Sequence, residues 1–380
     1  MFFIDPILNT LSMRAVYHCL VFLIFMTLIG GCSQELSTSS DTPYRFGGIF
    51  QLTGPQSFYG NLAKYGMELA IEDLNNAGGI NGRKIIGVYE DSAGDRVRAT
   101  TAAQKLIQVD NVDALFTITP GMAGAVAPIA EENKVPYIYI GSVNTFTINK
   151  TYVFKDYPSP QDLCQVLMKK AIDLGHKRVA LFGPNDEVTH LCREGAERVA
   201  PLLIVETFNP GDTDVRTQFT KIQQVQPSAL LLYSLSGDCP NAFKQLGELG
   251  LKIQLFLPVQ SFACGNTENT RTYGPFLSNA LGSDIALDEA STDPRFLSFK
   301  ERLVGRNWLI NIRGTALEYD IIHEMARAYT GCDNRVCVAD NLRALQMEGL
   351  TGKLHYDGGQ IVTRDVMLTR LSDKGWVNVE

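Results

Sequence analysis

Residues 52–84 of this chain read LTGPQSFYGNLAKYGMELAIEDLNNAGGINGRK. The apolar segment Arg45–Leu52 leads into this stretch and is expected to form a buried strand that ends at a Thr-Gly-Pro turn. Residues 61–76 carry apolar or small side chains at i,i+4 spacing, which predicts a helix with one buried face. Gly78 and Gly79 end this helix, because glycine adopts the left-handed conformation at little cost. The stretch therefore predicts the strand, turn and helix that open an α/β domain.

The same alternation of strand and helix continues in both directions from a break at residues 156–160 (DYPSP). Before it we expect strands at 84–90, 114–118 and 136–140 and helices at 99–109 and 123–132. After it we expect helices at 160–174, 187–200, 216–225 and 241–249 and strands at 178–182, 202–208, 229–233 and 254–257. Such alternation is typical of right-handed crossovers and parallel sheets. So many strands would overfill one open sheet, so the pattern favours two.

The rest of the chain is expected to return to the first half. Residues 294–304 and 316–329 have helical patterns, and residues 353–371 (KLHYDGGQIVTRDVMLTRL) predict short strands around a Gly-Gly turn.

The N-terminal segment has the features of an export signal. Residues 19–29 (CLVFLIFMTLI) are apolar and uncharged, too few to cross a bilayer, and Arg14 lies upstream. Translation starts at Met1 or Met13. Residues 28–33 (LIGGCS) resemble the lipobox of bacterial lipoproteins, in which two small residues precede a cysteine that becomes diacylated. We expect a lipoprotein signal peptide at 1–31, lipidation at Cys32 and a flexible tether at 32–43, with an ordinary signal peptide as the alternative.

Composition and motifs exclude several classes of function. The 380 residues have a formal net charge of −7, which gives no electrostatic footprint for nucleic acid. The sequence contains no GxSxG, P-loop or HExxH motif, so we do not expect an enzyme. It contains no CxxC motif and its histidines are scattered, so we expect neither a metal site nor a cofactor.

The cysteines suggest disulfides in an exported protein. Six remain once Cys19 is removed with the signal and Cys32 is lipidated, and six cysteines allow about fifteen connectivities. We expect Cys332 and Cys337 to close a small loop, with the remaining pairs Cys239–Cys264 and Cys164–Cys192.

Three segments together resemble the type I periplasmic binding proteins, specifically the branched-chain amino acid and amide group with its leucine-binding proteins. They are residues 52–84, residues 89–95 (YEDSAGD), and residues 127–136 (APIAEENKVP) with the Gly-Ser that follows at 141–142. The resemblance implies an α/β fold of two doubly wound parallel-sheet lobes joined by a three-crossover hinge, with the ligand in the cleft between them. It also implies lobes made of 44–157 plus 284–352 and of 158–283 plus 353–380.

The resemblance places four ligand-binding candidates in the first lobe. Tyr59 lies where the family has an aromatic contact with the ligand, although packing over its own loop is the alternative. Thr119 takes the place of a serine that holds the ligand carboxylate, and Pro120 beside it lacks an N–H. Gly141 and Ser142 match the second hydroxyl contact, with a turn-capping serine as the alternative.

The second lobe departs further from the family, which uses a tyrosine and an acid to hold an α-ammonium group. The candidates here are Asp186, Ser234 and Gln260. Asp186 could equally cap a helix, and Ser234 could lie in a solvated turn. These departures leave an amino acid, an amide, a carboxylate or another small metabolite as admissible ligands.

The function expected from the sequence is capture of a small ligand by hinge closure and its delivery to the permease of an ABC importer. The protein is expected to be a monomer, anchored by its lipid on the extracytoplasmic side of a membrane. The alternative is a ligand-free or sensory lipoprotein of the same fold that regulates an envelope enzyme or receptor. The departures at Pro120 and Val259 keep this alternative open.

Overall fold

The computed structural model describes residues 42–54, 56–209, 211–234, 239–258, 272, 277, 279–308, 311–372 and 375–379. Every described residue belongs to one compact unit, Asp41–Glu380. In these ranges no helix has the length and apolar character that a bilayer span requires. The expected export signal and Cys32 lie outside the described residues.

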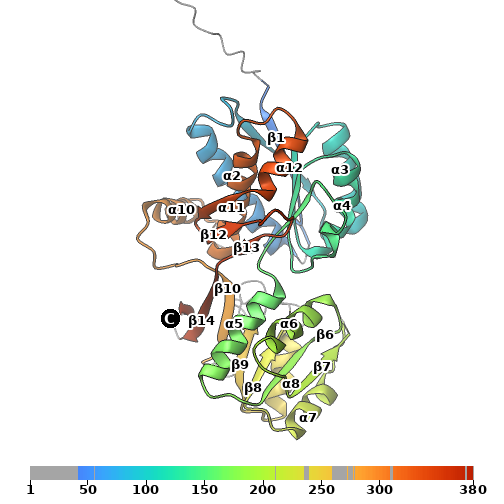
Figure 1. Ribbon diagram of the computed structural model, residues 1–380, viewed down its shortest axis with the longest axis vertical. Helices are drawn as coiled ribbons and strands as arrows, with labels where there is room; N and C mark the ends of the chain where they lie inside the picture. The colour runs from blue at the N-terminus through green and yellow to red at the C-terminus, as the bar shows by residue number, and fades with distance from the viewer. Residues whose placement is uncertain are drawn as a thin grey trace, which may run out of the picture. The chain divides into compact units, whose positions relative to one another are not determined.

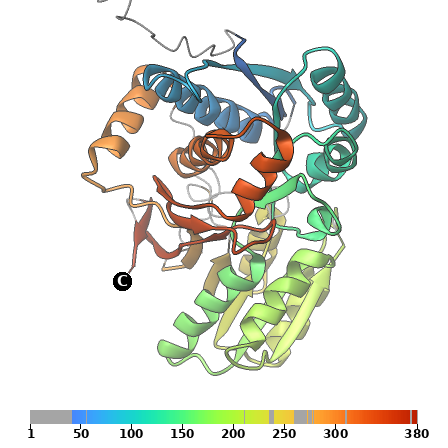
Figure 2. The same ribbon diagram turned by 45° about the horizontal axis from the view of Figure 1, so that its top comes forward.

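A five-stranded parallel sheet organises the first lobe, in the order β2-β1-β3-β4-β5. Its strands are β1 (Tyr44–Phe50), β2 (Ile85–Asp91), β3 (Ala114–Ile118), β4 (Tyr137–Ile140) and β5 (Val153–Asp156). Helices α2 (Ser57–Asn76) and α11 (Ile312–Tyr329) lie side by side, and Figure 2 shows them together. Helices α3 (Arg96–Gln108) and α4 (Pro120–Glu132) form a second pair.

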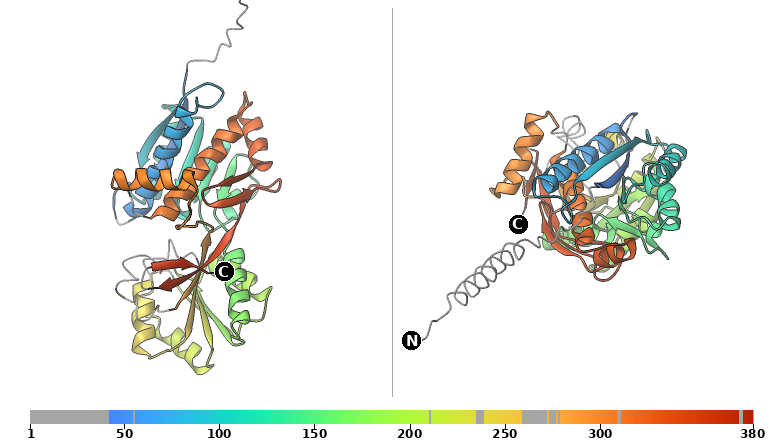
Figure 3. Two further views of the ribbon diagram at one scale, coloured as in Figure 1. Left: turned by 90° about the vertical axis from the view of Figure 1, so that its left-hand side faces the viewer. Right: turned by 90° about the horizontal axis from the view of Figure 1, so that it is seen from above.

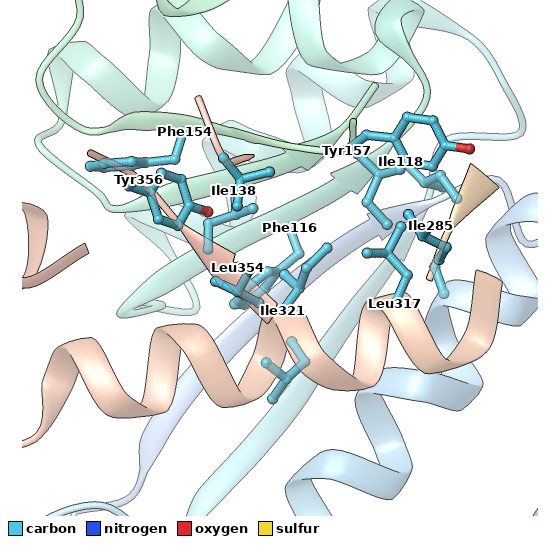
Figure 4. Close-up of a cluster of buried hydrophobic side chains, with 14 of the residues drawn as sticks. Phe116, Ile118, Ile138, Phe154, Tyr157, Ile285, Leu317, Ile321, Leu354 and Tyr356 are labelled. Atoms are coloured by element: carbon cyan, nitrogen blue, oxygen red, sulfur yellow. The ribbon is translucent and has the colours of Figure 1, made fainter. Parts of the chain in front are cut away.

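The sheet is buried on both faces, because alternate residues of each strand point to opposite sides. In β3, Phe116 joins a core cluster with residues of α2 and α11, whereas Leu115 joins a different cluster with residues of α3 and α4. Figure 4 shows part of the first cluster, where Phe116 and Ile138 lie near Leu317 and Ile321 of α11. The doubly wound arrangement therefore follows from strands that are apolar on both sides.

A seven-stranded sheet organises the second lobe, in the order β15-β14-β10-β9-β8-β6-β7. Its strands are β6 (Val179–Pro184), β7 (Ile204–Phe208), β8 (Ala229–Leu232), β9 (Gln254–Pro258), β10 (Leu281–Ile285), β14 (Val366–Ser372) and β15 (Gly375–Asn378). The pairings among β6 to β10 are parallel, and β14 and β15 add antiparallel strands at one edge. The helices are α5 (Pro160–Asp173), α6 (Glu187–Glu197), α7 (Arg216–Gln224) and α8 (Cys239–Glu248). Figure 1 labels all four around this sheet.

A small antiparallel sheet completes the first lobe. It contains β11 (Gln346–Gly349), β12 (Gly352–His355) and β13 (Thr363–Arg364), and two further helices are α10 (Pro294–Gly305) and α12 (Arg335–Arg343). The side chains of Leu354, Tyr356 and Val362 join the core cluster of the first sheet, and the Tyr356 ring packs edge-on against Phe154 at 5.8 Å.

Strand pairing thus moves to the second sheet after Arg364, about a dozen residues later than the sequence-based boundary at 352/353. The reason is that Leu354, Tyr356 and Val362 are buried in the core of the first lobe.

The chain passes between the two large sheets at three segments, which Figure 3 lets the reader follow. These are residues 157–159 after β5, residues 286–293 after β10, and Asp365 between β13 and β14. The structure confirms the expected α/β fold. Strands β5, β10, β11 and β15 and helix α12 were not predicted. Strand β5 escaped because Lys155 and Asp156, both fully buried, interrupt its apolar pattern.

Candidate functional site

Turns at the carboxyl edge of the first sheet bring several predicted residues together. Open α/β sheets bind their ligands at this edge. The turns after β1 and β2 are tied by Asp91, whose carboxylate accepts hydrogen bonds from the backbone N–H of Leu52 at 2.9 Å and from the hydroxyl of Thr53 at 2.5 Å. The turns after β3 and β4 also lie close, since a Cβ placed on Gly141 would be 3.5 Å from Pro120 Cγ. The turns after these strands therefore lie close together along one edge of the sheet, which we call the rim.

Thr119 has the most unusual backbone of this rim. It is the residue before α4 and has φ 82° and ψ 141°, a region that β-branched residues almost never adopt. The fully buried Gln51 holds it there, because Gln51 Nε2 donates to Thr119 Oγ1 at 2.8 Å and to the carbonyl of Ile118 at 3.2 Å. Backbone strain of this kind clusters at ligand-binding and catalytic sites. The strained backbone therefore supports Thr119 as a candidate ligand-binding residue, which the sequence predicts.

Ser142 contacts a residue of the second lobe. The hydroxyl of Tyr233 lies 3.4 Å from Ser142 Oγ and donates to it. Tyr233 follows β8 directly and is buried, and burial raises the pKa of its phenol well above the usual value, so the phenol stays protonated. The carboxyl edges of the two sheets therefore meet at a pair of hydroxyl groups. Tyr233 was missed because the sequence placed it inside the strand; its position at a strand end was the available signal.

Glu187 makes a second link between the lobes. It lies in the first turn of α6, and its carboxylate accepts from the backbone N–H of Asn144 and from the hydroxyl of Thr145, both at 3.1 Å. Asn144 and Thr145 belong to the segment that follows β4 in the first lobe. No signal in the sequence separates Glu187 from an ordinary acidic residue at the start of a helix.

Asp186 caps α6. Its carboxylate accepts from the backbone N–H groups of Val188 at 3.0 Å and Thr189 at 3.3 Å. Partial burial raises the pKa of the Asp186 carboxyl, although these two hydrogen bonds act in the opposite direction. This geometry is the helix cap that the sequence left as the alternative, so a contact between Asp186 and a ligand stays a prediction.

The other predicted residues are placed as follows. Tyr59 lies within the first turn of α2 rather than in a loop, half-buried, with its ring edge-on to Phe58 at 5.4 Å. Ser234 is fully buried and follows Tyr233. Gln260 lies outside the described residues. Ligand contacts of Tyr59 and Ser234 therefore remain predictions.

A buried lysine lies near the same junction and was not predicted. The ammonium of Lys155 donates to the carbonyl of Tyr157 at 2.7 Å, where the chain crosses to the second lobe. Burial lowers the pKa of Lys155 to about 8, and the charges of Asp156, Asp162 and Glu187 partly oppose this shift.

Disulfides connect elements away from this rim. The structure contains the predicted pairs Cys164–Cys192, which joins α5 to α6, and Cys332–Cys337. Cys239 is also disulfide-bonded, and because Cys264 lies outside the described residues the pairing of these two stays a prediction. Within the described ranges, no group of three or more His, Cys, Asp or Glu side chains could hold a metal ion.

The sequence of this chain is similar to those of known binding proteins. A sequence profile described as "Periplasmic binding protein" matches residues 43–375. The Leu/Ile/Val-binding protein homolog 7 of Brucella suis biovar 1 is 30% identical over 128 residues, which is 33% of this chain. The aligned stretch spans only 32% of that relative's own length.

Solved structures match over most of the chain. The branched-chain amino acid transporter substrate-binding protein LivJ of Streptococcus pneumoniae, in complex with isoleucine, has a TM-score of 0.75 at 20% identity. The match covers 89% of this chain and 100% of LivJ. A solute-binding protein of an R. palustris ABC transporter, in complex with benzoate, has a TM-score of 0.73 at 17% identity. That match covers 89% of this chain and 96% of the R. palustris protein. At these identities the similarity establishes the fold, and it confirms the two-lobed architecture expected from the sequence.

Proposed function

This chain belongs to the periplasmic binding protein family, and we propose on that basis that it captures a small organic ligand between its two lobes and delivers it to an ABC importer. The family is one of binding proteins, so the polar groups at the carboxyl edges of the sheets serve recognition rather than catalysis.

One observation carries this proposal. The carboxyl edges of the two sheets contact each other through Tyr233 and Ser142, two neutral hydroxyl groups from different lobes. Each hydroxyl can donate one hydrogen bond and accept others, so the pair suits a ligand that inserts between them and exchanges their mutual contact for its own. The 3.4 Å separation is at the weak end of the range for a hydrogen bond between hydroxyls, so little stability is lost when a ligand replaces it.

The ligand we propose is a small carboxylate with an apolar body. LivJ was crystallised with isoleucine and the R. palustris protein with benzoate, and the two compounds share a carboxylate attached to an apolar group. Pro120 leaves this chain with one backbone donor fewer at the start of α4, and the hydroxyls of Thr119 and Ser142 remain as side-chain donors.

Calorimetry and thermal shift with isoleucine, leucine, benzoate and 4-hydroxybenzoate test this proposal. At least one compound is expected to raise the melting temperature of the purified protein saturably, because a ligand that binds the folded state alone stabilises it. Ser142→Ala is expected to weaken that ligand by about 10-fold, the equivalent of one lost hydrogen bond.

The matched control is Ser228→Ala, at the amino end of β8, where the hydroxyl contacts only the Arg178 carbonyl among described residues. This variant should bind as the wild type does. If no small molecule in a broad library binds, and a protein partner co-purifies instead, the regulatory alternative replaces the transport function.

We also propose that Cys32 anchors the protein to the extracytoplasmic side of a membrane. The residues LIGGCS and the apolar run before them support this, and disulfide-bonded cysteines are typical of proteins exported to an oxidising compartment. In cells fed labelled palmitate, the wild type should carry label and sediment with membranes, whereas Cys32→Ala should be unlabelled. Label retained by Cys32→Ala would contradict the assignment. Cys19→Ala, within the apolar run, is the matched control.

A further inference from the structure

The carboxylate of Glu187 connects the start of α6 in the second lobe to the segment that follows β4 in the first lobe. Its Oε1 accepts from the backbone N–H of Asn144 and its Oε2 from the hydroxyl of Thr145, both at 3.1 Å. Hydrogen bonds that end on a carboxylate are roughly twice as strong as those between neutral groups. Because one carboxylate carries both bonds, the lobes separate at this point only when both are broken.

The segment that Glu187 contacts is fixed to the first lobe. The hydroxyl of Tyr139, a buried residue of β4, donates to the carbonyl of Val143 at 2.8 Å. The hydroxyl of the buried Thr147 donates to the carbonyl of Asn144 at 2.9 Å and closes the turn. The N–H of Asn144 is therefore held in place relative to the first sheet.

Helix α6 is fixed in the second lobe in a similar way. Asp186 caps it by accepting from two backbone N–H groups of its first turn. The disulfide between Cys164 and Cys192 ties α6 to α5. A lasting separation of Glu187 from Asn144 therefore requires that one lobe moves against the other.

This contact acts across the hinge. Asn144 precedes the first crossing segment, residues 157–159, and Glu187 follows it, 43 residues after Asn144. Rotation about the crossing segments moves the lobes against each other and separates the two partners. The contact between Tyr233 and Ser142 also joins the lobes, but at 3.4 Å it is longer and both its groups are neutral hydroxyls. Glu187 therefore makes the stronger of these two links.

We infer that Glu187 is a latch: its bonds to Asn144 and Thr145 hold the two lobes closed at their carboxyl edges and strengthen the binding of every ligand alike. This inference rests on the proposed function and adds a control of affinity to it. A ligand that binds the closed lobes gains apparent affinity in proportion to the fraction of protein that is already closed. All groups of the latch belong to the protein, so its effect does not depend on the chemistry of the ligand.

The distance between the lobes, measured without any ligand, tests the latch directly. Spin labels on the full chain, at cysteines introduced as Arg98→Cys on α3 and Arg198→Cys after α6, report this distance by double electron–electron resonance, since both residues are exposed. Glu187→Ala should raise the ratio of open to closed protein about 10-fold, the equivalent of one hydrogen bond to a charged group. Glu187→Gln keeps one acceptor oxygen and should give a smaller change.

The affinities of isoleucine and benzoate, measured by calorimetry, separate a latch from a contact with the ligand. Glu187→Ala should weaken each compound that binds by the same factor, up to about 10-fold, because the variant changes closure alone. Thr145→Val removes one of the two partners and should weaken binding less. Added to Glu187→Ala, it should have no further effect, because the bond it removes is already lost.

The matched control is Glu194→Ala, two turns further along α6, where the carboxylate pairs with Gln161 and His190 of the same lobe. This variant should keep the wild-type distances and affinities, and circular dichroism checks that each variant is folded. A wild type without a closed population, or a distance distribution that Glu187→Ala leaves unchanged, overturns the inference. A weaker affinity for one compound alone also overturns it and makes Glu187 a ligand contact. A wild type that binds neither compound contradicts the proposed ligand class, and the distances still decide whether the latch exists.

Discussion

Replacing Arg364 with methionine is expected to lower the free energy of unfolding by about 3–5 kcal/mol, because it leaves buried carboxylates without their countercharge. The side chain of Arg364 is fully buried. It forms two hydrogen bonds with the carboxylate of Asp156, one with Glu324 and one with the hydroxyl of Thr351 at 2.8 Å. Urea denaturation, monitored by circular dichroism, measures the loss of unfolding free energy.

The position of this network explains why the effect should be large. Asp156 is the last residue before the first crossing segment, and Arg364 is the last residue before the third. Glu324 belongs to α11, and its other oxygen accepts from the hydroxyl of Tyr356 at 2.9 Å. Burial raises the pKa of the Glu324 carboxyl, with the nearby Asp156 charge adding to the effect. One buried cation therefore holds together three separate parts of the first lobe where the hinge strands leave it.

Two further variants decide whether the network causes the loss. Arg370→Met removes an exposed arginine on β14 and should change stability by less than about 0.5 kcal/mol. The triple variant Arg364→Met, Asp156→Leu, Glu324→Leu removes the carboxylates as well and should regain most of the lost stability, since apolar replacements of buried ion pairs are often neutral. A loss of stability below about 1 kcal/mol in Arg364→Met would contradict the prediction. It would mean that the buried carboxylates do not depend on Arg364 as their countercharge.

Removing the disulfide between Cys164 and Cys192 is expected to lower the free energy of unfolding by about 3–4 kcal/mol. Without this crosslink the unfolded chain gains the conformational entropy of the loop that the two cysteines close. The two cysteines are 28 residues apart and lie on α5 and α6. These helices pack so closely that a Cβ on Gly195 would be 2.1 Å from the carbonyl oxygen of Gln161. The folded contacts should therefore survive the double variant Cys164→Ala, Cys192→Ala, and the loss should appear in urea denaturation.

The second disulfide supplies an internal comparison. Cys332 and Cys337 are 5 residues apart, and so short a loop predicts a smaller loss of about 2 kcal/mol for their double alanine variant. A larger loss from this pair than from Cys164 and Cys192 would contradict the loop-entropy explanation. Circular dichroism of both variants before denaturation checks that each is folded.

Part of the candidate site could be predicted because strand ends are visible in the sequence. Thr119 and Ser142 follow the apolar runs ALFTI and YIYI, and the carboxyl ends of parallel strands share one edge of a sheet. Tyr233 was missed by one position, since the apolar run ALLLY includes it whereas β8 ends at Leu232. Glu187 was missed for another reason. A charged residue in the first turn of a helix resembles any solvated residue until its neighbours in space are known.

By itself, the sequence determined the α/β class and two large sheets rather than one, and it predicts an export signal at the N-terminus. These properties are local: periods of about two and 3.6 residues, turn residues between them, and a short apolar run are all recorded along the chain. The tertiary structure alone decided which groups meet. Arg364 and Asp156 are 208 residues apart, and Tyr233 and Ser142 are 91 apart, so no local pattern records either contact. Burial of a charge is tolerated only where folding brings its partner, and that partner is a property of the fold.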